Sequence, residues 1–479
     1  MITNPPKESQ SQMKRITATE IATQYEYMDK VRALAGHERR YFVRTFGCQQ
    51  NEADSEQIAG MCEHMGYLPA ISPDDADLII VNTCAVREHA ELRALSVTGQ
   101  YKKLKARKPE LVICICGCMV TQDSRVSDIK RSYPYVDLLF GTGMLHRFPE
   151  LLYEELTTRR RRFAVDDTDG CIAEGLPKKR ESRSKAWVSV MYGCNNFCTY
   201  CVVPYVRGRE RSRNPSDILD EVRGLVADGC REITLLGQNV NSYGRDLDDS
   251  CDFADLVSEI DQIDGDFIIR FMTSHPKDAN RKLIDIMASS KKCARQFHLP
   301  LQSGSERVLS AMNRRYTPDE YLKLIEYMRE VMPNIAISSD IIVGFPGESD
   351  DEFNETLELL SKIRFDMIFS FIYSPRVGTP AAKMENQIPE EIKSARMSRL
   401  LELQNQISYE KNLCEVGKVE RVLLEGESRG DSNMLTGRAD SNKLVHIPRD
   451  EVSERQIGEF VRVKITRAEP FALIGELEN

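Results

Sequence analysis

The stretch Tyr192–Arg213, "YGCNNFCTYCVVPYVRGRERSR", carries three cysteines within eight residues: Cys194, Cys198 and Cys201. No other cysteine or histidine follows in the next dozen residues. Structural zinc sites are closed by four ligands, and ferredoxin-type clusters also take four cysteines each. Three thiolates on one loop leave one iron of a four-iron cluster without a protein ligand. The motif therefore predicts an open metal position at which a substrate binds.

The composition is that of a globular protein of 479 residues, 41% hydrophobic and 29% charged, a length that favours two to four domains. No apolar run reaches the roughly 18 residues of a membrane span, and the first residues lack a signal segment. We expect a cytoplasmic protein that has no membrane association. In a reducing compartment, the 14 cysteines are metal ligands, catalytic groups or core residues rather than disulfides.

The hydrophobic patterns predict an α/β multidomain chain with three folded parts. Short β-like runs alternate with helical stretches twice, which indicates parallel sheets, and a period of two follows near the end. The expected segments are 1–38, disordered or poorly ordered; 39–157, an open parallel α/β sheet domain; 158–185, an arginine-rich linker; 186–412, a partial β/α barrel with six units; and 413–479, a small antiparallel β-barrel.

A second set of three cysteines is spread over the first folded part. Cys48 follows the run "YFVRTFG", Cys84 follows "DLIIVNT" and Cys118 follows "LVICICG". In an open α/β sheet the carboxyl ends of neighbouring strands share one edge, where ligands bind. We therefore expect these cysteines to converge there and to supply three thiolates to a second cluster with an open iron.

The other cysteines are not expected to bind metal. Cys114 and Cys116 alternate with isoleucines inside a strand, so we expect them to pack on its face. The remaining six have no partner spacing and are assigned to core or surface: Cys62, Cys171, Cys230, Cys251, Cys293 and Cys414.

The CxxxCxxC loop at the end of the first barrel strand resembles the radical S-adenosylmethionine (SAM) enzymes. The resemblance implies that the open iron chelates the amino and carboxylate groups of SAM, and that an electron from the cluster then releases a 5′-deoxyadenosyl radical. It also implies SAM contacts from the ends of later strands. These are Gly237 and Gln238 for the amino group, Gln302 and Ser303 for the ribose, and Gly344, Pro346 and Gly347 for the adenine.

The wording "GCQQNEADSE", "NTCAVREHAE" and "CVVPYVRGRERSR", with the terminal β domain, is similar to the methylthiotransferases over about Tyr41 to Glu476. The resemblance implies an N-terminal methylthiotransferase domain, a radical SAM barrel and a TRAM-like domain. It also implies two [4Fe-4S] clusters, with no catalytic side chain beyond their ligands. SAM would act twice, as methyl donor to a sulfur on the first cluster and as radical source at the second.

The implied substrate is carbon 2 of N6-isopentenyladenosine next to the anticodon, in the anticodon stem-loop of tRNA. That C–H bond is not acidic enough for a side-chain base near neutral pH, so a radical is required. Relatives act on threonylcarbamoyl-adenosine in tRNA or on a ribosomal protein aspartate, and these substrates stay open as alternatives. The reaction further implies an electron donor such as flavodoxin or ferredoxin and a sulfur source. We expect a monomer.

Charge indicates where the RNA binds. The net charge is −9, but nine basic and two acidic residues lie between Lys178 and Arg213. This local excess suits an anionic polymer, although a solvated surface run is the alternative. The residues expected to contact RNA are Lys178, Lys179, Arg180, Arg207, Arg209 and Arg211. From Cys414 onward there are ten basic and thirteen acidic residues, so net charge does not support RNA binding there.

Two other classes of protein remain to be compared. An iron–sulfur electron carrier would close its clusters with four protein ligands, whereas both sets here stop at three. An RNA-binding protein with structural metal sites would have no use for six β/α units. The spacing therefore favours an enzyme.

Overall fold

The computed structural model describes residues 15–34, 36–86, 88–165, 170–248 and 250–478. They form two compact units, which we describe separately. Unit 1 contains the described residues up to Glu181, together with Met191–Phe197 and Cys201–Arg213. Unit 2 contains Ser182–Val190, Cys198–Tyr200 and the chain from Asn214 onward. No helix in these residues combines the length and the apolar character that a membrane crossing requires.

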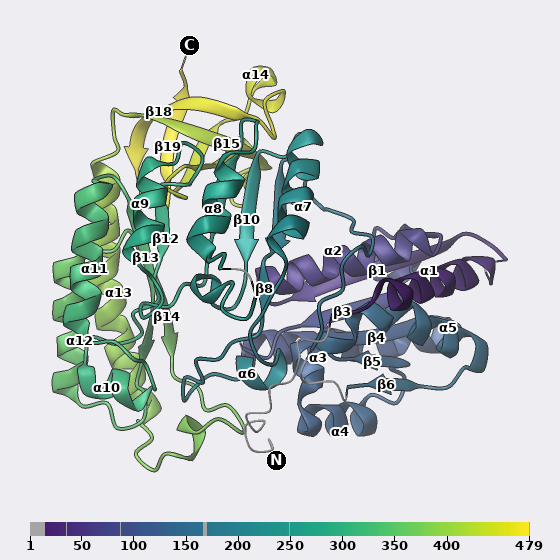
Figure 1. Cartoon of the computed structure of the whole chain (residues 1–479). Coiled ribbons are helices and arrows are strands. Elements are labelled where there is room, and N and C mark those ends of the chain that lie inside the picture. The colour runs from purple at the N-terminus through teal and green to yellow at the C-terminus, as the bar shows by residue number, and fades with distance from the viewer. Residues whose placement is uncertain (1–14, 35, 87, 166–169, 249, 479) are drawn as a thin grey trace. The chain divides into compact units, whose positions relative to one another are not determined.

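Unit 1 is built on a six-stranded sheet in which all neighbouring strands are parallel. The order is β2-β1-β3-β4-β5-β6, so the first strand lies inside the sheet (Figure 1). The strands are β1 (Arg39–Phe46), β2 (Tyr67–Pro69), β3 (Leu78–Thr83), β4 (Val112–Gly117), β5 (Leu138–Phe140) and β6 (Arg162–Ala164). This is the open parallel α/β sheet that the alternating pattern predicts.

Helices cover both faces of this sheet because its central strands are apolar on both sides. Leu78 and Ile80 point into one core and Ile79 and Val81 into the other. The first core also receives α1 (Ala18–Ala33), α2 (Gln49–His64) and α5 (Phe148–Thr158), and the second receives α3 (Glu88–Arg107) and α4 (Asp123–Ser132). Cys114 and Cys116 lie in the first core, which confirms that they pack on the face of β4.

The register of the sheet aligns the carboxyl ends of three neighbouring strands. Phe46 at the end of β1 pairs with Thr83 at the end of β3, and Thr83 pairs with Gly117 at the end of β4. The residues that follow these strand ends therefore emerge from the same edge.

Two elements lie in stretches that the sequence predicts to be poorly ordered or to form a linker. Within 1–38, predicted as disordered or poorly ordered, Ala18–Ala33 is a helix that begins with a capping box of Thr17 and Glu20 and buries Met28 completely. Tertiary packing outweighs its polar composition. The predicted linker 158–185 contains β6, which pairs with β5 because the backbone of an edge strand needs no apolar run. Residues 1–14 lie outside the described part of the chain.

Unit 2 begins with six parallel strands in two three-stranded sheets. The first has the order β11-β10-β7 and the second β12-β13-β14. The strands are β7 (Lys185–Ser189), β10 (Glu232–Leu236), β11 (Ile268–Phe271), β12 (Gln296–His298), β13 (Ala336–Val343) and β14 (Met367–Ile372). The six units predicted for the β/α barrel are present.

The helices of this part follow the strands in alternation. Three of them begin with capping boxes, which satisfy free backbone N–H groups at their first turns. In chain order the helices of this part are α7 (Pro215–Ala227), α8 (Phe253–Asp261), α9 (Arg281–Ser289), α10 (Glu306–Ala311), α11 (Pro318–Val331), α12 (Asp350–Ile363) and α13 (Glu390–Leu413). The capping boxes are those of α8, α11 and α12.

A closed five-stranded barrel ends unit 2, in the order β15-β16-β17-β19-β18. Its strands are β15 (Val419–Glu427), β16 (Met434–Ala439), β17 (Leu444–Pro448), β18 (Phe460–Ala468) and β19 (Leu473–Leu477), and a short helix, α14 (Glu451–Glu454), interrupts them. All pairs are antiparallel except β17 with β19. With this barrel the predicted fold class is confirmed.

Buried arginine contacts attach this barrel to the amino-terminal ends of the parallel strands. Arg270 of β11 donates to the carbonyl oxygens of Ala439, at 2.8 Å, and Asp440, at 3.0 Å. It also pairs with Glu232 at 2.6 Å, and Lys185 of β7 bridges Glu232 and Glu425 of β15. The small barrel thus lies against the end of the strands opposite to their carboxyl edge.

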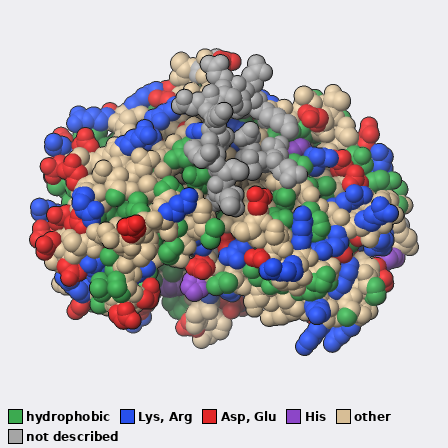
Figure 2. Space-filling view, turned by 90° about the horizontal axis from the view of Figure 1, so that it is seen from below, with side chains coloured by type: hydrophobic (Ala, Val, Ile, Leu, Met, Phe, Trp, Pro, Cys, Tyr) green, Lys and Arg blue, Asp and Glu red, His purple; other side chains and the backbone are tan. Residues whose placement is uncertain are grey.

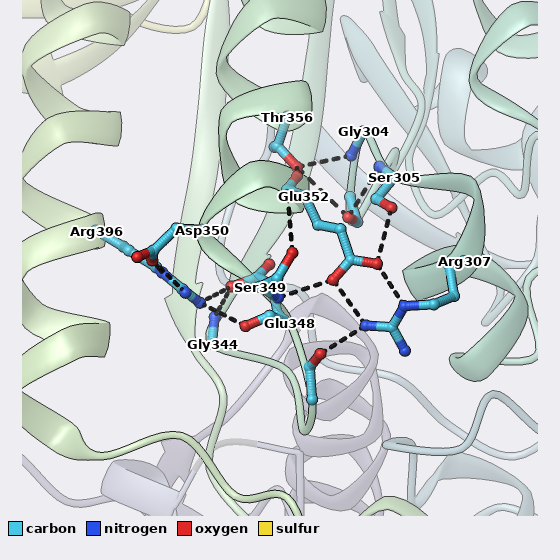
Figure 3. A network of polar contacts seen from close by, with 12 residues as sticks. Gly304, Ser305, Arg307, Gly344, Glu348, Ser349, Asp350, Glu352, Thr356 and Arg396 are labelled. Carbon is cyan, nitrogen blue, oxygen red and sulfur yellow. Dashed lines mark hydrogen bonds and ion pairs between the residues drawn. The ribbon is translucent and has the colours of Figure 1, made fainter.

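A polar network holds the loops that follow β12 and β13 (Figure 3). Glu348 accepts the backbone N–H of Gly344 at 2.8 Å and is paired with buried Arg396 at 2.8 Å. Glu352 of α12 is paired with Arg307, whose guanidinium also donates to the carbonyl oxygen of Gly347. Two loops at the carboxyl edge are thereby tied to one helix.

This network predicts an acid-sensitive contribution to stability. The hydrogen bond from Arg307 lowers the pKa of Glu352 to about 2, below the roughly 4.3 of an unfolded chain. The stabilisation is therefore present above about pH 4.5 and is lost as the pH falls toward 2. Arg307→Gln should cost about 1 kcal/mol near pH 6 and about half as much near pH 3, measured by urea denaturation.

The matched control is Arg399→Gln, because Arg399 donates to the neutral amide of Asn354 on the same helix, α12. Its effect should not depend on pH. An equal loss of stability for Arg307→Gln at both pH values would contradict the assignment.

Two candidate cysteine centres

The three cysteines at the edge of the sheet in unit 1, Cys48, Cys84 and Cys118, are here called the edge thiols. Cys48 is the N-cap residue of α2, Cys84 directly follows β3, and Cys118 begins the short helix η2 (Cys118–Thr121) after β4. The Cys84 thiol lies within hydrogen-bond range of both others. The three residues therefore emerge at the same edge of the sheet, and their role as ligands of one cluster stays a prediction.

Local backbone features set this convergence. Gly117 has a φ of 96°, and a Cβ atom there would lie 2.4 Å from Asn82 Oδ1, so only glycine allows the turn that follows β4. Asn82 also donates to the carbonyl oxygen of Asn51 at 2.8 Å, and Asn51 accepts from the Cys48 thiol at 3.3 Å. The amide pair therefore ties the start of α2 to the end of β3.

Ionisation of the edge thiols is unequal. A hydrogen bond from Cys84, with help from the Arg207 charge, lowers the pKa of Cys48 to about 6 and also lowers the pKa of Cys118. The pKa of Cys84 is raised because its thiol donates to its neighbours. Thiolates are the form that binds iron. Within the described residues, no group of three or more His, Cys, Asp or Glu side chains is arranged so that it could hold a metal ion.

Arg207, which the sequence assigns to RNA binding, lies beside the edge thiols. It is 6% exposed, its Nε donates to Cys118 Sγ at 3.1 Å, and its Nη2 donates to Asp54 Oδ2 at 2.8 Å. A buried cation beside two thiols of lowered pKa offsets negative charge there. Its partner Asp54 lies 153 residues away in the chain, so no local pattern indicates the pair.

The second set, Cys194, Cys198 and Cys201, is here called the loop cysteines. Cys194 donates its N–H to the Gly208 carbonyl oxygen at 3.1 Å. Gly193 before it has a φ of 78°, and a Cβ atom would lie 1.9 Å from the Arg209 carbonyl oxygen. Glycine is therefore required where the loop begins.

The two ends of this loop have different neighbours. Val202, next to Cys201, is buried in unit 1 with Val206, Ala85 and Cys118. Thr199, the residue after Cys198, belongs to unit 2, and its hydroxyl donates to the Ala311 carbonyl oxygen at 2.9 Å. Each of these two parts of the loop is thus held by contacts of its own unit.

A second buried arginine, missed from the sequence, contacts this set. Arg314 in unit 2 lies 3.6 Å from Cys198 Sγ through Nη1, and it donates to the Tyr316 hydroxyl and to the Pro300 carbonyl oxygen. Charges and hydrogen bonds around it raise the pKa of Arg314 despite its burial, so it stays cationic. Each cysteine set therefore has one buried guanidinium beside a thiol.

The residues expected to contact SAM follow three parallel strands of unit 2. Gly237 and Gln238 follow β10, Gln302 and Ser303 lie after β12, and Gly344, Pro346 and Gly347 follow β13. Ser303 is fully buried, and its oxygen accepts from the Ser305 N–H at 3.2 Å and lies 3.4 Å from the Thr356 hydroxyl. A ribose contact by Ser303 stays a prediction.

Buried polar atoms without a hydrogen-bond partner lie after β10, β11 and β12. Among the described residues they include Gln302 Oε1, Asn239 Oδ1, Ser274 Oγ and His275 Nε2. Burial is the largest cause that lowers the pKa of His275, so its ring is neutral. Because buried polar atoms normally have partners, this group fits a polar ligand at the carboxyl edge.

The residues expected to bind RNA divide into two groups. Lys178 and Lys179 are exposed, and Arg180 and Arg209 are partly exposed. Arg207 and Arg211 are buried, and Arg211 donates to the carbonyl oxygens of Arg207 and Arg209. The donors of these two side chains point into the protein, and a contact of either with RNA stays a prediction. On the face drawn in Figure 2, Lys and Arg side chains are interspersed with Asp and Glu.

Comparisons with known proteins match three parts of the chain. Residues 188–360 match the model of the radical SAM superfamily, residues 40–141 match an uncharacterized protein family, UPF0004, and residues 414–477 match the TRAM domain. A solved structure of the radical SAM methyltransferase TsrM from Kitasatospora setae aligns with a TM-score of 0.53 at 14% identity, over 72% of this chain and 75% of that one. It supports the fold alone.

Curated relatives cover nearly the whole chain. A protein of Desulforamulus reducens is 47% identical over 94% of this chain and 98% of its own length. One of Alkaliphilus oremlandii is 50% identical over 92% and 93%. Both are named tRNA-2-methylthio-N(6)-dimethylallyladenosine synthase. With this identity over almost the full length, the chain belongs to the MiaB family of radical SAM tRNA methylthiotransferases.

Proposed function

We propose that this protein converts N6-isopentenyladenosine (dimethylallyladenosine), next to the anticodon of tRNA, to its 2-methylthio derivative. The observation that carries the proposal is the presence of two three-cysteine sets in a chain about half identical to enzymes named for this product. One set alone suits many radical enzymes. The second supplies a place for the sulfur.

The edge thiols and the loop cysteines are proposed as ligands of two [4Fe-4S] clusters, each with one open iron. The donor chemistry fits, because soft thiolates are the usual cluster ligands and each set has a buried guanidinium nearby to offset charge. When bound, the clusters and SAM supply one-electron chemistry that opens an aryl C–H bond, and the methylthio group that replaces the hydrogen.

The protein's own part is to bind, orient and shield. Arg207 and Arg314 donate hydrogen bonds to one thiol of each set, which lowers the negative charge of the thiolates. Gln302 and Asn239 present buried polar atoms at the carboxyl edge, which suits the SAM contacts proposed there together with Gly237, Gln238, Gly344, Pro346 and Gly347. The network around Glu352 holds the loops that carry several of these residues.

Several accompanying proposals follow from the reaction. The tRNA substrate supports a cytoplasmic location. The chemistry calls for an electron donor such as flavodoxin or ferredoxin and for a source of sulfur. The monomeric state stays a prediction, as do the domain limits 39–157, 186–412 and 413–479.

The decisive experiment is anaerobic reconstitution with iron, sulfide, SAM and a reductant, with tRNA that carries the isopentenyl group. We expect 5′-deoxyadenosine, S-adenosylhomocysteine and a gain of one methylthio group on the tRNA. Two parallel reactions contain unmodified tRNA and tRNA with threonylcarbamoyl-adenosine. A product from the latter alone would replace the proposed substrate, and absence of deoxyadenosine would overturn the radical reaction.

The exposed basic segment is proposed to contact the tRNA backbone. Changing Lys178, Lys179 and Arg180 to glutamine should weaken tRNA binding at low salt. It should also reduce the slope of log affinity against log salt by roughly 0.7–0.9 for each phosphate that the protein no longer neutralises. Binding is measured by filter retention at several salt concentrations.

The matched control replaces three exposed basic residues of α3, Lys102, Lys103 and Arg107, and so changes the net charge equally. It should leave the slope nearly unchanged. Equal effects of both triple variants would assign the loss to overall charge rather than to this segment.

A further inference from the structure

Cys171, which its sequence spacing assigns to core or surface, is in contact with a histidine in unit 1. Its Sγ lies 3.2 Å from Nδ1 of His146 and 3.3 Å from the carbonyl oxygen of Gly143. His146 is 7% exposed, and Cys171 is half-buried. The next residue, Ile172, accepts the N–H of Ile16 at 2.9 Å, which fixes this part of the chain. A thiol whose proton an imidazole can accept is an activated nucleophile.

The pair lies at the same edge of the sheet as the edge thiols. His146 belongs to η3 (Thr142–Arg147), which directly follows β5, and β5 is the neighbour of β4. The register pairs Phe140 at the end of β5 with Cys116 of β4, two residues before Cys118. The short helix that carries His146 therefore emerges beside the turn that carries Cys118.

A small cavity lies beside the pair, on the side of Arg207. Cys171, His146, Asp54, Arg207 and Arg211 line it, and its volume is about 50 Å³. Arg207 also donates to Cys118 Sγ at 3.1 Å, so one guanidinium separates the cavity from an edge thiol. A buried water needs roughly 10–15 Å³ by this measure. The cavity therefore admits a group as small as one added sulfur atom, and not a nucleoside.

Neither of two simpler roles accounts for this arrangement. Zinc sites need at least three protein ligands, and within the described residues no further His, Cys, Asp or Glu completes a set with Cys171 and His146. An inert core cysteine would lie among apolar side chains, whereas this one borders a cavity with two arginines. Two arginines against the one carboxylate of Asp54 leave these walls with a net positive charge, which favours an anionic sulfur species such as a persulfide.

We infer that Cys171 accepts a sulfane sulfur from a persulfide donor and holds it beside the edge thiols. The inference rests on the proposed function, because it supplies the sulfur which that reaction consumes. The Cys171 thiolate attacks the outer sulfur of a donor R–S–SH, and a new S–S bond forms. The S–S bond of the donor breaks, and its inner sulfur leaves as R–S⁻.

Atoms, protons and electrons balance in this step. R–S–SH and Cys171–SH give R–SH and Cys171–S–SH, with no net oxidation, and His146 takes the proton from Cys171 and returns it to R–S⁻. Release as sulfide needs a dithiol reductant: Cys171–S–SH and R(SH)₂ give Cys171–SH, a cyclic disulfide and H₂S. Both co-reactants belong to common classes of thiol compounds.

The test measures sulfur loading directly. Full-length protein is treated anaerobically with ³⁴S-labelled glutathione persulfide, without SAM or tRNA, then alkylated and digested. We expect the peptide that contains Cys171 to carry one labelled sulfur, and a portion treated with dithiothreitol before alkylation to release labelled sulfide. Cys171→Ser should abolish this label. His146→Gln should slow loading roughly tenfold or more, since an unassisted thiol is only a few per cent thiolate near neutral pH.

The matched control is Cys251, which is similarly half-buried but lies among carboxylates, and whose pKa burial raises to about 11. Its peptide should stay unlabelled, and Cys251→Ser should load Cys171 at the rate of the unaltered protein. Equal labelling of Cys251 and Cys171, or an unchanged rate in His146→Gln, would overturn the inference.

Loading and the proposed function fail separately. The unaltered enzyme with inorganic sulfide, SAM, reductant and isopentenylated tRNA tests methylthio transfer without a persulfide donor. Transfer without loading of Cys171 would overturn the inference alone. Loading without any transfer would overturn the proposed function and leave Cys171 as a sulfur carrier for another acceptor.

Discussion

Cys118→Ala should remove about one cluster's worth of iron, from roughly eight to roughly four atoms per chain, and abolish methylthio transfer. Cys118 leaves the sheet edge after the strained turn at Gly117, in contact with Cys84. The two thiolates that remain, Cys48 and Cys84, are too few to hold a [4Fe-4S] cluster. Iron and acid-labile sulfide contents, with the spectrum of the reduced protein, measure the effect.

Formation of 5′-deoxyadenosine should survive in this variant, because the loop cysteines are unchanged. The matched control is Cys116→Ala, in β4 two residues before Cys118. Cys116 is 1% exposed in the core below the sheet, and its replacement should leave the iron content unchanged while lowering stability slightly. The reverse outcome, with iron lost from Cys116→Ala and kept by Cys118→Ala, would exchange the roles of these two cysteines.

Arg207→Gln should have the second large effect, on stability and on the reduction potential of the cluster proposed at the edge thiols. The change removes a buried cation and leaves the Asp54 carboxylate without its partner, which costs about 3–5 kcal/mol. Loss of one positive charge a few ångströms from the cluster should also lower its potential, on the order of 100 mV at an effective dielectric constant of about 20. Redox titration followed by spectroscopy measures this shift.

A double variant separates the two effects. Arg207→Gln with Asp54→Asn removes both charges, so much of the stability should return, and the potential should stay closer to that of the unaltered protein than in the single variant. Arg213→Gln is the control for removing a buried arginine, since Arg213 is paired with Glu174. An unaltered potential in Arg207→Gln would show that the guanidinium serves stability alone.

The edge of the first sheet could be predicted from the sequence because parallel strands align their ends. The sequence shows apolar runs that are followed by Cys48, Cys84 and Cys118. The rule that neighbouring parallel strands end together then predicts that these runs end at one edge, and the register confirms that the three strand ends are aligned. The same rule predicts the strand ends that carry Gly237 and Gly344. Such predictions rest on period and position, which a single sequence contains.

What the sequence could not show depends on pairing across long distances. Arg207 and Arg211 lie in a run that has the composition of an RNA-binding surface, yet Arg207 pairs with Asp54 inside unit 1 and Arg211 with backbone carbonyls. Cys171 and His146 are 25 residues apart, with no spacing that indicates contact. Helix α1 has too narrow an apolar stripe to be recognised before its partner helix α5 is known.

The attachment of the small barrel bears on how far this protein can be recombined. Because Arg270 of β11 makes hydrogen bonds to two carbonyl oxygens of the barrel and a buried ion pair with Glu232, the seam is specific to these side chains. A chimera that received the terminal domain of a distant homologue would leave a buried guanidinium without acceptors unless the backbone matched. In engineering terms, the terminal domain is not an interchangeable module, and it must be exchanged together with the strands it touches.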